Sequence, residues 1–393
     1  MAVHPTTTSH LKHRRRLTRA RGRWRAAWPT IGLAAAWILP AGQVDAQATT
    51  PVPSDLACPT CTIRVDAVVT IGRDDDRLGS RPYAVRRDSR GRYHMVAPES
   101  NPSVPLVFSA RGGFLRELGR EGAGPGEFRD AIALEITRGD TIHVFDRGNA
   151  RLSVLDPGMR EVRTSPIPPS TNTAIVLPTG TVVVNAAVGE PDRIGHPFHR
   201  LDQDGNYTGY FGADAGSPVQ PGDIAGTVRW MTPALGNKFW SLNYARSYTL
   251  ELWDADGTLL KRITRDADWF APYDRATSLA PRNPPQSRGM GVWYDQRVGL
   301  LWTIMHVADP RWRDGTGPLR RAHGEEYLPI HDMQRVYDTI VEVIDVNTNR
   351  VLARRRFDMT IDLPIGAGLF AGARETPEGA PYLDVWRFSL VER

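Results

Sequence analysis

The chain has 393 residues, 41% of them hydrophobic and 24% charged, which is enough to bury a sizeable core. Its 49 basic and 44 acidic residues give a formal net charge of +5, but eight of the basic residues and one acidic residue lie in the first 48 positions. The remaining 345 residues hold 41 basic and 43 acidic residues, so the net charge gives no support to nucleic-acid binding.

The first 48 residues have the organisation of a secretory signal peptide. A basic head at residues 12–25 precedes a short apolar run at 31–39, and Ala46-Gln47-Ala48 provides a small-x-small cleavage site. The apolar run is shorter than the ~20 residues that a spanning helix needs, so a signal peptide is favoured over a membrane anchor. We therefore expect an exported protein, periplasmic or extracellular, with no membrane span after the leader is cleaved.

Both cysteines, Cys58 and Cys61, lie in a Pro/Thr-rich stretch at residues 49–63 that we expect to be a linker. In an oxidising compartment, two cysteines this close in sequence most simply form a disulfide. A thioredoxin-like redox pair would need a helix start, whereas β-rich sequence follows, and zinc would need two further ligands nearby. A local disulfide is therefore the favoured interpretation.

From residue 64 onward, short apolar runs alternate with turn signals, as expected for successive β-strands. The turns between the third and fourth strands of successive units are 45, 47 and 52 residues apart, at Gly113, Gly158, Gly205 and Gly257. The next such turn, at Asn349, is 92 residues further on, which fits one unit enlarged by an insertion at 308–336. A period of about 40–50 residues with four strands per unit is typical of β-propellers.

Six units can be counted, and the first strand of the chain completes them. The sixth unit lacks a fourth strand, while the apolar run at 64–71 is a strand without a sheet. Placing this N-terminal strand on the last blade closes the ring and leaves few free sheet edges. The sequence therefore predicts an all-β fold, a six-bladed β-propeller of four-stranded blades over residues 64–393, with the insertion in blade 5.

The second unit carries the clearest motif. The Gly-rich segment GAGPGEF at 122–128 leads into IALEITRGDTIHVFDRGNARLSVLD at 132–156. This stretch resembles the NHL-repeat family of six-bladed propellers, whose pattern falls on Val144, Asp146, Asn149, Arg151, Leu152, Val154, Leu155 and Asp156. The resemblance implies a secreted bacterial propeller, a group whose members mostly have no assigned function. It also implies that Asp146 and Asn149 tie the loop between the second and third strands.

No catalytic constellation is evident in the sequence. The Gly-rich loop at 122–126 lacks the following helix and the Lys-Ser/Thr pair of a phosphate cradle, and no G-x-S-x-G elbow occurs. The segments at 202–205 and 254–257 imitate the start of a calcium loop, but the twelfth position holds Ala213 or Arg265 instead of Glu, so we expect hairpin turns. A polar cluster in the insertion contains His323, Glu325, Glu326, His331 and Asp332. These residue types suit zinc, yet they lack an enforced ligand spacing and are more simply an exposed loop.

Propeller geometry supplies the candidate site instead. Loops that join the second strand to the third, and loops that join one blade to the next, share one face around the central channel, where concave ligand sites are expected. Polar residues from five blades are expected on that face, namely Glu99, Asn101, Asp146, Asn149, Arg193, Arg246 and His306. The insertion is expected to emerge there as well.

These features favour an exported binding module for a protein, peptide or glycan of the cell envelope, with no catalytic residue, metal or cofactor assigned. The alternative is a metal-dependent lactonase, hydrolase or lyase with calcium or zinc in the central channel, as in related six-bladed propellers. The fold alone does not choose between the two, because propellers host many unrelated functions.

Overall fold

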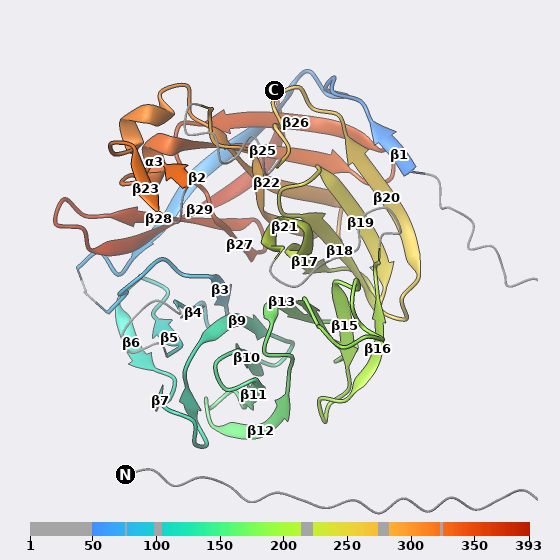
Figure 1. The fold of residues 1–393 in the computed structure, drawn as a ribbon, viewed down its shortest axis with the longest axis vertical. Helices are drawn as coiled ribbons and strands as arrows, with labels where there is room; N and C mark the ends of the chain where they lie inside the picture. The colour runs from blue at the N-terminus through green and yellow to red at the C-terminus, as the bar shows by residue number, and fades with distance from the viewer. Residues whose placement is uncertain (1–48, 75–76, 98–103, 214–222, 274–282, 323–324) are drawn as a thin grey trace, which may run out of the picture. The chain divides into compact units, whose positions relative to one another are not determined.

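The computed structural model describes residues 49–74, 77–97, 104–213, 223–273, 283–322 and 325–393. Within these residues, six antiparallel sheets stand as blades around a central axis (Figure 1), which confirms the six-bladed β-propeller. The expected leader, residues 1–48, lies outside the described residues, as do Glu99 and Asn101. No helix of the described part is long and apolar enough to cross a membrane.

Each blade runs outward from an inner strand beside the axis, in sequence order. Blade 1 consists of β3 (Ala84–Arg87), β4 (Tyr93–Val96), β5 (Leu106–Phe108) and β6 (Phe114–Glu117). Blade 2 consists of β9 (Ala131–Ile136), β10 (Ile142–Asp146), β11 (Arg151–Leu155) and β12 (Glu161–Pro166), and it is preceded by the short pair β7 (Arg120–Glu121) and β8 (Glu127–Phe128). Blade 3 consists of β13 (Thr171–Val176), β14 (Val182–Ala186), β15 (Phe198–Leu201) and β16 (Tyr207–Phe211).

The second half of the ring follows the same plan with additions. The one-turn helix α1 (Ile224–Thr227) precedes blade 4, which consists of β17 (Arg229–Pro233), β18 (Lys238–Asn243), β19 (Thr249–Asp254) and β20 (Leu259–Arg265). Blade 5 consists of β21 (Arg288–Asp295), β22 (Leu300–Ala308), β25 (Tyr337–Asp345) and β26 (Arg350–Phe357). Its insertion holds η1 (Trp312–Gly315), the hairpin β23 (Arg320–Ala322) and β24 (Glu325–Tyr327), and α3 (Met333–Val336). Blade 6 consists of β27 (Leu363–Gly366), β28 (Leu369–Glu375), β29 (Pro381–Glu392) and β2 (Cys61–Ile71).

The middle strands of the blades are mostly buried. Every residue of β4, β10 and β14 is buried, whereas the outer strand β12 alternates between more and less exposed positions. Neighbouring blades cover a middle strand on both faces, so both of its alternating sets of side chains must be apolar or hydrogen-bonded. This is why the apolar alternation in the sequence is only partial.

The hydrophobic core is divided into layers between adjacent blades. Phe145 of blade 2 and Val184 of blade 3 belong to one such layer, and both are fully buried. Ile304 of blade 5 and Phe370 of blade 6 belong to another. Because every blade contributes to two layers, the ring is stable only when all of its blades are in place.

The N-terminal strand closes the ring as the sequence predicts. Strand β2 pairs antiparallel with β29 from Cys61 opposite Glu392 to Ile71 opposite Leu383, and so forms the outer strand of blade 6. Immediately before it, the sulfur atoms of Cys58 and Cys61 lie at bonding distance, 2.00 Å, with their Cα atoms 5.2 Å apart. The expected local disulfide is therefore present, and it sits where β2 begins.

The segment at 49–63, expected to be a linker, instead carries regular pairing along the rim. Strand β1 (Thr49–Val52) pairs in parallel with β20 of blade 4, and Leu56 forms a bridge with Val351 of blade 5. Arg265 donates hydrogen bonds to the carbonyl oxygens of Val52 and Pro53, both at 2.8 Å. The outer edges of blades 4 and 5 offer unpaired backbone groups, and the Pro/Thr-rich composition did not reveal that this segment pairs with them.

The calcium-like turns are hairpin turns, as expected. Asp202 accepts hydrogen bonds from the backbone N–H groups of Asp204 and Asn206, each at 2.9 Å, between β15 and β16. Gly205 has φ = +84°, and a Cβ atom there would lie 2.5 Å from the carbonyl oxygen of Pro166 in blade 2. Glycine is required here both for the left-handed backbone and for the close approach of two blades.

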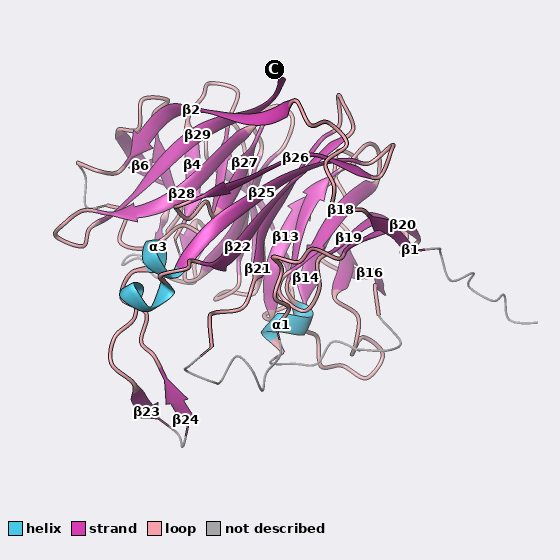
Figure 2. Cartoon of the chain, turned by 90° about the horizontal axis from the view of Figure 1, so that it is seen from above, coloured by secondary structure: helices cyan, strands magenta, loops and turns pink. Residues whose placement is uncertain are grey.

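We call the face that carries the blade-to-blade loops and the second-to-third-strand loops the channel face; its described residues include 147–150, 244–248, 309–322, 325–336 and 358–362. Figure 2 shows α1, α3 and the β23–β24 hairpin together on this side of the ring. The insertion of blade 5 therefore projects from the channel face, where the sequence predicts it.

Candidate functional site

A cavity of about 500 Å³ lies on the propeller axis. All six inner strands contribute to its wall, through Arg86, Leu134, Thr173, Trp230, Met290 and Leu363. It is built near the start of the inner strands, because Asn172, Trp230 and Arg288 lie within the first two residues of β13, β17 and β21 and Arg81 and Tyr83 lie just before β3. A concave space of this size is within the range of small-molecule sites, roughly 300–1,000 Å³.

The cavity reaches the solvent at the channel face. Tyr83 and Ile224 line it and are also 42% and 64% exposed. Arg147 and Tyr244, from the second-to-third-strand loops of blades 2 and 4, and Met333, from the blade 5 insertion, complete the mouth. The loops of several blades therefore frame one opening.

Four arginines stand in the wall of this cavity, and three of them form ion pairs. The guanidinium group of Arg86 donates two hydrogen bonds to Glu135, at 3.0 and 2.6 Å. Arg81 donates to Asp362 at 2.5 Å, and Arg147 donates to Asp130 at 2.7 Å. The pairs of Arg86 and Arg81 link blade 1 to blades 2 and 6, whereas the pair of Arg147 lies within blade 2.

The fourth arginine, Arg288, has a different environment. Its guanidinium carbon lies 4.3 Å from the centroid of the Tyr337 ring, a cation–π contact. Its Nε and Nη2 atoms are buried and make no hydrogen bond, and no carboxylate of the described residues lies within salt-bridge distance of it. A guanidinium group stays charged inside a protein, so Arg288 brings an uncompensated positive charge to the cavity wall.

His306, expected on the ligand-binding face, lies behind this wall. It is fully buried, its Nε2 atom lies 3.0 Å from the carbonyl oxygen of Ile361, and its ring stacks on Tyr337. Burial, followed by the positive charges of Arg288 and Arg81, lowers the pKa of His306 well below its usual value. The imidazole is therefore neutral, and a ligand in the cavity cannot reach it.

Asp146 and Asn149 hold the backbone of the Gly-rich loop. The carboxylate of Asp146 is fully buried and accepts hydrogen bonds from the N–H group of Asp130 at 3.0 Å and from Asn149 Nδ2 at 2.7 Å. Asn149 Nδ2 also donates to the carbonyl oxygen of Gly122 at 2.8 Å. Arg151 donates to the carbonyl oxygens of Ala123, Gly124 and Glu127. These contacts leave the polar groups of the motif engaged in loop structure.

The remaining expected site residues also lie away from the cavity wall. Arg193 stacks over the ring of Tyr207 at 3.9 Å, and Arg246 pairs with Asp223 at 2.6 Å. None of the five described residues in the expected ligand-binding set lines the cavity. Most of them lie in loops of the channel face, whereas much of the wall is made from the inner strands.

A sequence signal for the wall does exist. Arg81 lies just before an inner strand, Arg288 is the first residue of one, and Arg147 directly follows a second strand. Each position meets the channel face at the axis in a propeller of this topology. Arginines at these positions, located after the strands are assigned, would have indicated the cavity.

The wall does not fit the calcium or zinc of the alternative hypothesis. No Asp, Glu or His occurs among the described residues that line the cavity, and carboxylates or imidazoles are the ligands that these ions need. The carboxylates nearest to the wall arginines, on Glu135 and Asp362, are already bound by Arg86 and Arg81. A positively charged wall also repels a cation.

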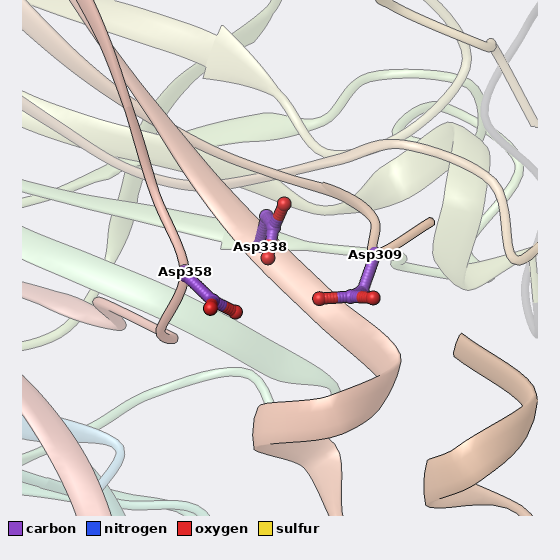
Figure 3. Close-up of side chains that lie close together, drawn as sticks. All are labelled: Asp309, Asp338 and Asp358. Carbon is purple, nitrogen blue, oxygen red and sulfur yellow. The ribbon is translucent and has the colours of Figure 1, made fainter. Parts of the chain in front are cut away.

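One acidic cluster lies elsewhere, at the base of the blade 5 insertion (Figure 3). Asp309 follows β22, Asp338 is in β25 and Asp358 follows β26, and their ligand atoms lie within 4.8 Å of one another. It is the one group of three such side chains in the described residues. Among the described residues of the insertion, the expected polar cluster does not bring three potential metal ligands this close together.

Arginines already compensate this acidic cluster. Arg356 Nε donates to Asp338 at 2.5 Å, and Arg311 lies 3.7 Å from Asp309 and 3.5 Å from Asp358. Burial, against the opposing effect of Arg356, raises the pKa of Asp338, and the neighbouring Asp309 adds to the rise. The cluster supplies three carboxylates where calcium takes six to eight oxygen ligands, and it holds two guanidinium groups, so it does not by itself form a metal site.

Comparisons with known proteins identify the fold. No family model and no curated protein sequence matches the chain. Two solved structures are similar over most of the ring: a candidate exported protein of Bacteroides fragilis, with a TM-score of 0.55 over 87% of this chain and 99% of that one, and a member of the DUF4221 family from Bacteroides vulgatus, with a TM-score of 0.57 over 84% and 99%. Both are 10% identical to this chain. Virginiamycin B lyase from Staphylococcus aureus is also 10% identical, with a TM-score of 0.45 over 83% and 99%. The two Bacteroides structures support the propeller fold, and similarity at this level of identity assigns no activity.

Proposed function

We propose that this protein is an exported binding module that takes a small-molecule ligand into its axial cavity from the channel face. The observation that carries the proposal is the cavity itself, about 500 Å³, lined by all six blades and reaching the solvent beside Tyr83 and Ile224. Rigid inner strands form most of its wall, so the site is largely preformed, as ligand sites usually are. Its concave shape suits a small molecule, or the end of a peptide or glycan chain, better than a flat protein surface.

Export is part of the proposal. The basic head, apolar run and small-x-small site of residues 1–48 support a cleaved leader. The Cys58–Cys61 disulfide fits an oxidising compartment, either periplasmic or extracellular. A binding protein in such a compartment would meet its ligand outside the cytoplasm.

We further propose that ligand binding requires neither a metal ion nor a cofactor. The described cavity wall offers arginines and apolar groups and no carboxylate or imidazole to hold a cation. The metal-dependent lactonase, hydrolase or lyase of the alternative hypothesis therefore has no specific observation in its favour at the cavity.

The test is a ligand screen by thermal shift on the full-length protein and on a variant with an occluded cavity. Asn172 lines the cavity on the inner strand of blade 3, so Asn172→Trp should fill part of it. Leu235→Trp is the matched control, because Leu235 is 63% exposed and lies in the turn after β17, away from the channel face. A ligand at 100 times its dissociation constant should stabilise the folded protein by about 2.7 kcal/mol.

We expect that small molecules which raise the melting temperature of the wild type and of Leu235→Trp have no such effect on Asn172→Trp. If the same molecules stabilise all three proteins equally, they bind outside the cavity and the proposal is wrong. Repeating the screen with EDTA checks the metal statement, and a stabilisation that EDTA abolishes would contradict it.

A further inference from the structure

The charges of the cavity wall indicate what kind of ligand it takes. Four arginines line the cavity, and no acidic side chain does so in the described residues. Arg81, Arg86 and Arg147 each have a carboxylate partner behind or beside the wall. The local positive charge that remains unpaired is that of Arg288.

Arg288 is held in place while part of its hydrogen-bonding capacity stays unused. Its guanidinium carbon lies 4.3 Å from the centroid of the Tyr337 ring, and the imidazole of His306 also stacks on that ring. Its Nε and Nη2 atoms are shielded from solvent and have no acceptor. A guanidinium charge without a carboxylate partner is costly when it is partly buried, so an anionic group in the cavity beside Arg288 would supply the missing counter-charge.

The environment of His306 is a second sign of positive potential at this point. Arg288 and Arg81 both act, after burial, to hold the pKa of His306 far below its usual value. The imidazole therefore adds no positive charge of its own, and it offers no negative charge to neutralise Arg288. Of the two guanidinium groups that act on His306, those of Arg288 and Arg81, only that of Arg81 has a carboxylate partner.

The rest of the wall is largely apolar. Trp230, Met290 and Val228 line it, and Met333 and Ile224 do so at the mouth. The indole N–H group of Trp230 already donates to the carbonyl oxygen of Gly289 at 2.6 Å, so the indole makes its polar contact within the protein. A ligand body in contact with these side chains gains by being aromatic or aliphatic.

We infer that the ligand is an organic anion with an apolar body, and that Arg288 binds its carboxylate or equivalent oxyanion. This inference rests on the proposed function, because it names the ligand class of the same cavity. The planar fork of a guanidinium group matches the two oxygens of a carboxylate, and charge-assisted bonds of this kind are among the strongest in proteins. The apolar body then occupies the part of the cavity next to Trp230 and Met290.

The experiment compares two acids with their neutral amides on the full-length protein. Phenylacetate and phenylacetamide form one pair, and octanoate and octanamide form the other, so each pair differs in charge and hardly in shape. Binding is followed by ligand-observed NMR titration for the wild type, Arg288→Gln, Arg288→Lys and Asn172→Trp. Arg160→Gln is the matched control, because Arg160 pairs with Asp156 at 2.8 Å in an exposed turn of the opposite face.

We expect the wild type to bind the acids more tightly than the amides, and Arg288→Gln to lose this preference by roughly 10- to 100-fold in affinity. Arg288→Lys keeps the charge but not the fork, so it should restore part of the preference. Arg160→Gln should behave as the wild type. If Arg288 had a purely structural role, Arg288→Gln would weaken the binding of acids and amides alike. Arg288→Lys would then not restore the binding of the acids selectively.

The outcomes separate the inference from the proposed function. If acids and amides bind equally, and both are lost in Asn172→Trp, the cavity is a ligand site and the anion inference is overturned. If an acid preference persists unchanged in Arg288→Gln, the assignment to Arg288 is overturned. If no acid or amide binds at millimolar concentration, or if binding is the same in Asn172→Trp, both the inference and its premise fail.

Discussion

Replacement of Glu342 should destabilise the ring more than the loss of any surface ion pair does. Glu342 lies in β25 and is fully buried, as is Arg265 at the end of β20. Its carboxylate accepts hydrogen bonds from Arg265 at 2.8 and 3.1 Å, from Arg354 at 2.7 Å and from the Tyr248 hydroxyl at 2.8 Å. The network therefore links blade 4 to blade 5.

The size of the destabilisation follows from the buried positive charge that remains after the substitution. In Glu342→Gln the buried guanidinium of Arg265 loses its counter-charge, and breaking a buried pair in this way costs about 3–5 kcal/mol. With an unfolding entropy of about 2.1 cal/mol/K per residue over roughly 345 residues, this loss lowers the melting temperature by about 4–7 °C. Burial and the Glu342 carboxylate also raise the pKa of Tyr248 well above its usual value, so this hydroxyl stays protonated and donates to the carboxylate throughout the neutral range.

Differential scanning calorimetry of two variants measures this effect. Glu326→Gln is the control, because Glu326 pairs with Arg321 at 2.7 Å in the exposed β23–β24 hairpin, where an ion pair is worth about 0–1 kcal/mol. We expect a shift of several degrees for Glu342→Gln and almost none for Glu326→Gln. Equal shifts for the two variants would refute the argument that burial of the network makes it important.

Three further predictions concern stability. Burial lowers the pKa of His143 and of His199 to about 4, so the unfolded chain binds more protons than the folded chain below pH ~6.5. The contribution of the two neutral histidines to the free energy of unfolding is complete above pH ~6.5 and is lost as the pH falls to ~4. The loss is about 1.4 kcal/mol per pH unit for each histidine. Denaturant unfolding between these pH values should show this slope, and His143→Gln should reduce it by one proton; an unchanged slope would show that His143 does not contribute. Gly205→Ala should destabilise more than Gly180→Ala, because both residues have positive φ, costing about 1–2 kcal/mol, but only at Gly205 would a Cβ atom meet the neighbouring blade; equal melting temperatures would contradict this. Asp146→Ala should speed hydrogen exchange of the three backbone amides that donate to its carboxylate, those of Arg129, Asp130 and Asn149, while ligand binding in the cavity is unchanged; a loss of binding would show that Asp146 has a role at the site.

The fold could be predicted from the sequence because its determinants are local. The turn between the third and fourth strands needs a residue with positive φ, and glycine or asparagine takes this place at Gly205, Gly257 and Asn349. The turns therefore recur in the sequence with the period of the blades. The pairing of the first strand with the incomplete last unit could be predicted as well, because a strand without a sheet is unstable alone.

The site could not be predicted in the same way because its determinants are not local. Arg81 and Arg288 are brought to one cavity only by closure of the ring, since more than 200 residues separate them in sequence. Polarity was no guide, because Asp146 is polar in order to hold a backbone loop while Met290 is apolar and lines the cavity. A side chain's role in a propeller depends on its radial position, which is known only after the strands have been assigned.

The pairing of β2 with β29 also fixes when the protein can finish folding. Synthesis and translocation deliver a chain from its N-terminus, so β2 emerges first and its partner, which ends at Glu392, emerges last. During that interval the earlier blades can form their own hairpins, but the outer strand of blade 6 has nothing to pair with. The segment that runs from β1 past Leu56 to β2 lies along blades 4, 5 and 6, so it too must wait for the second half of the chain. The ring is thus closed by a step that requires the last strand of the sixth blade, and a truncated product lacking that strand stays open and unprotected against proteases.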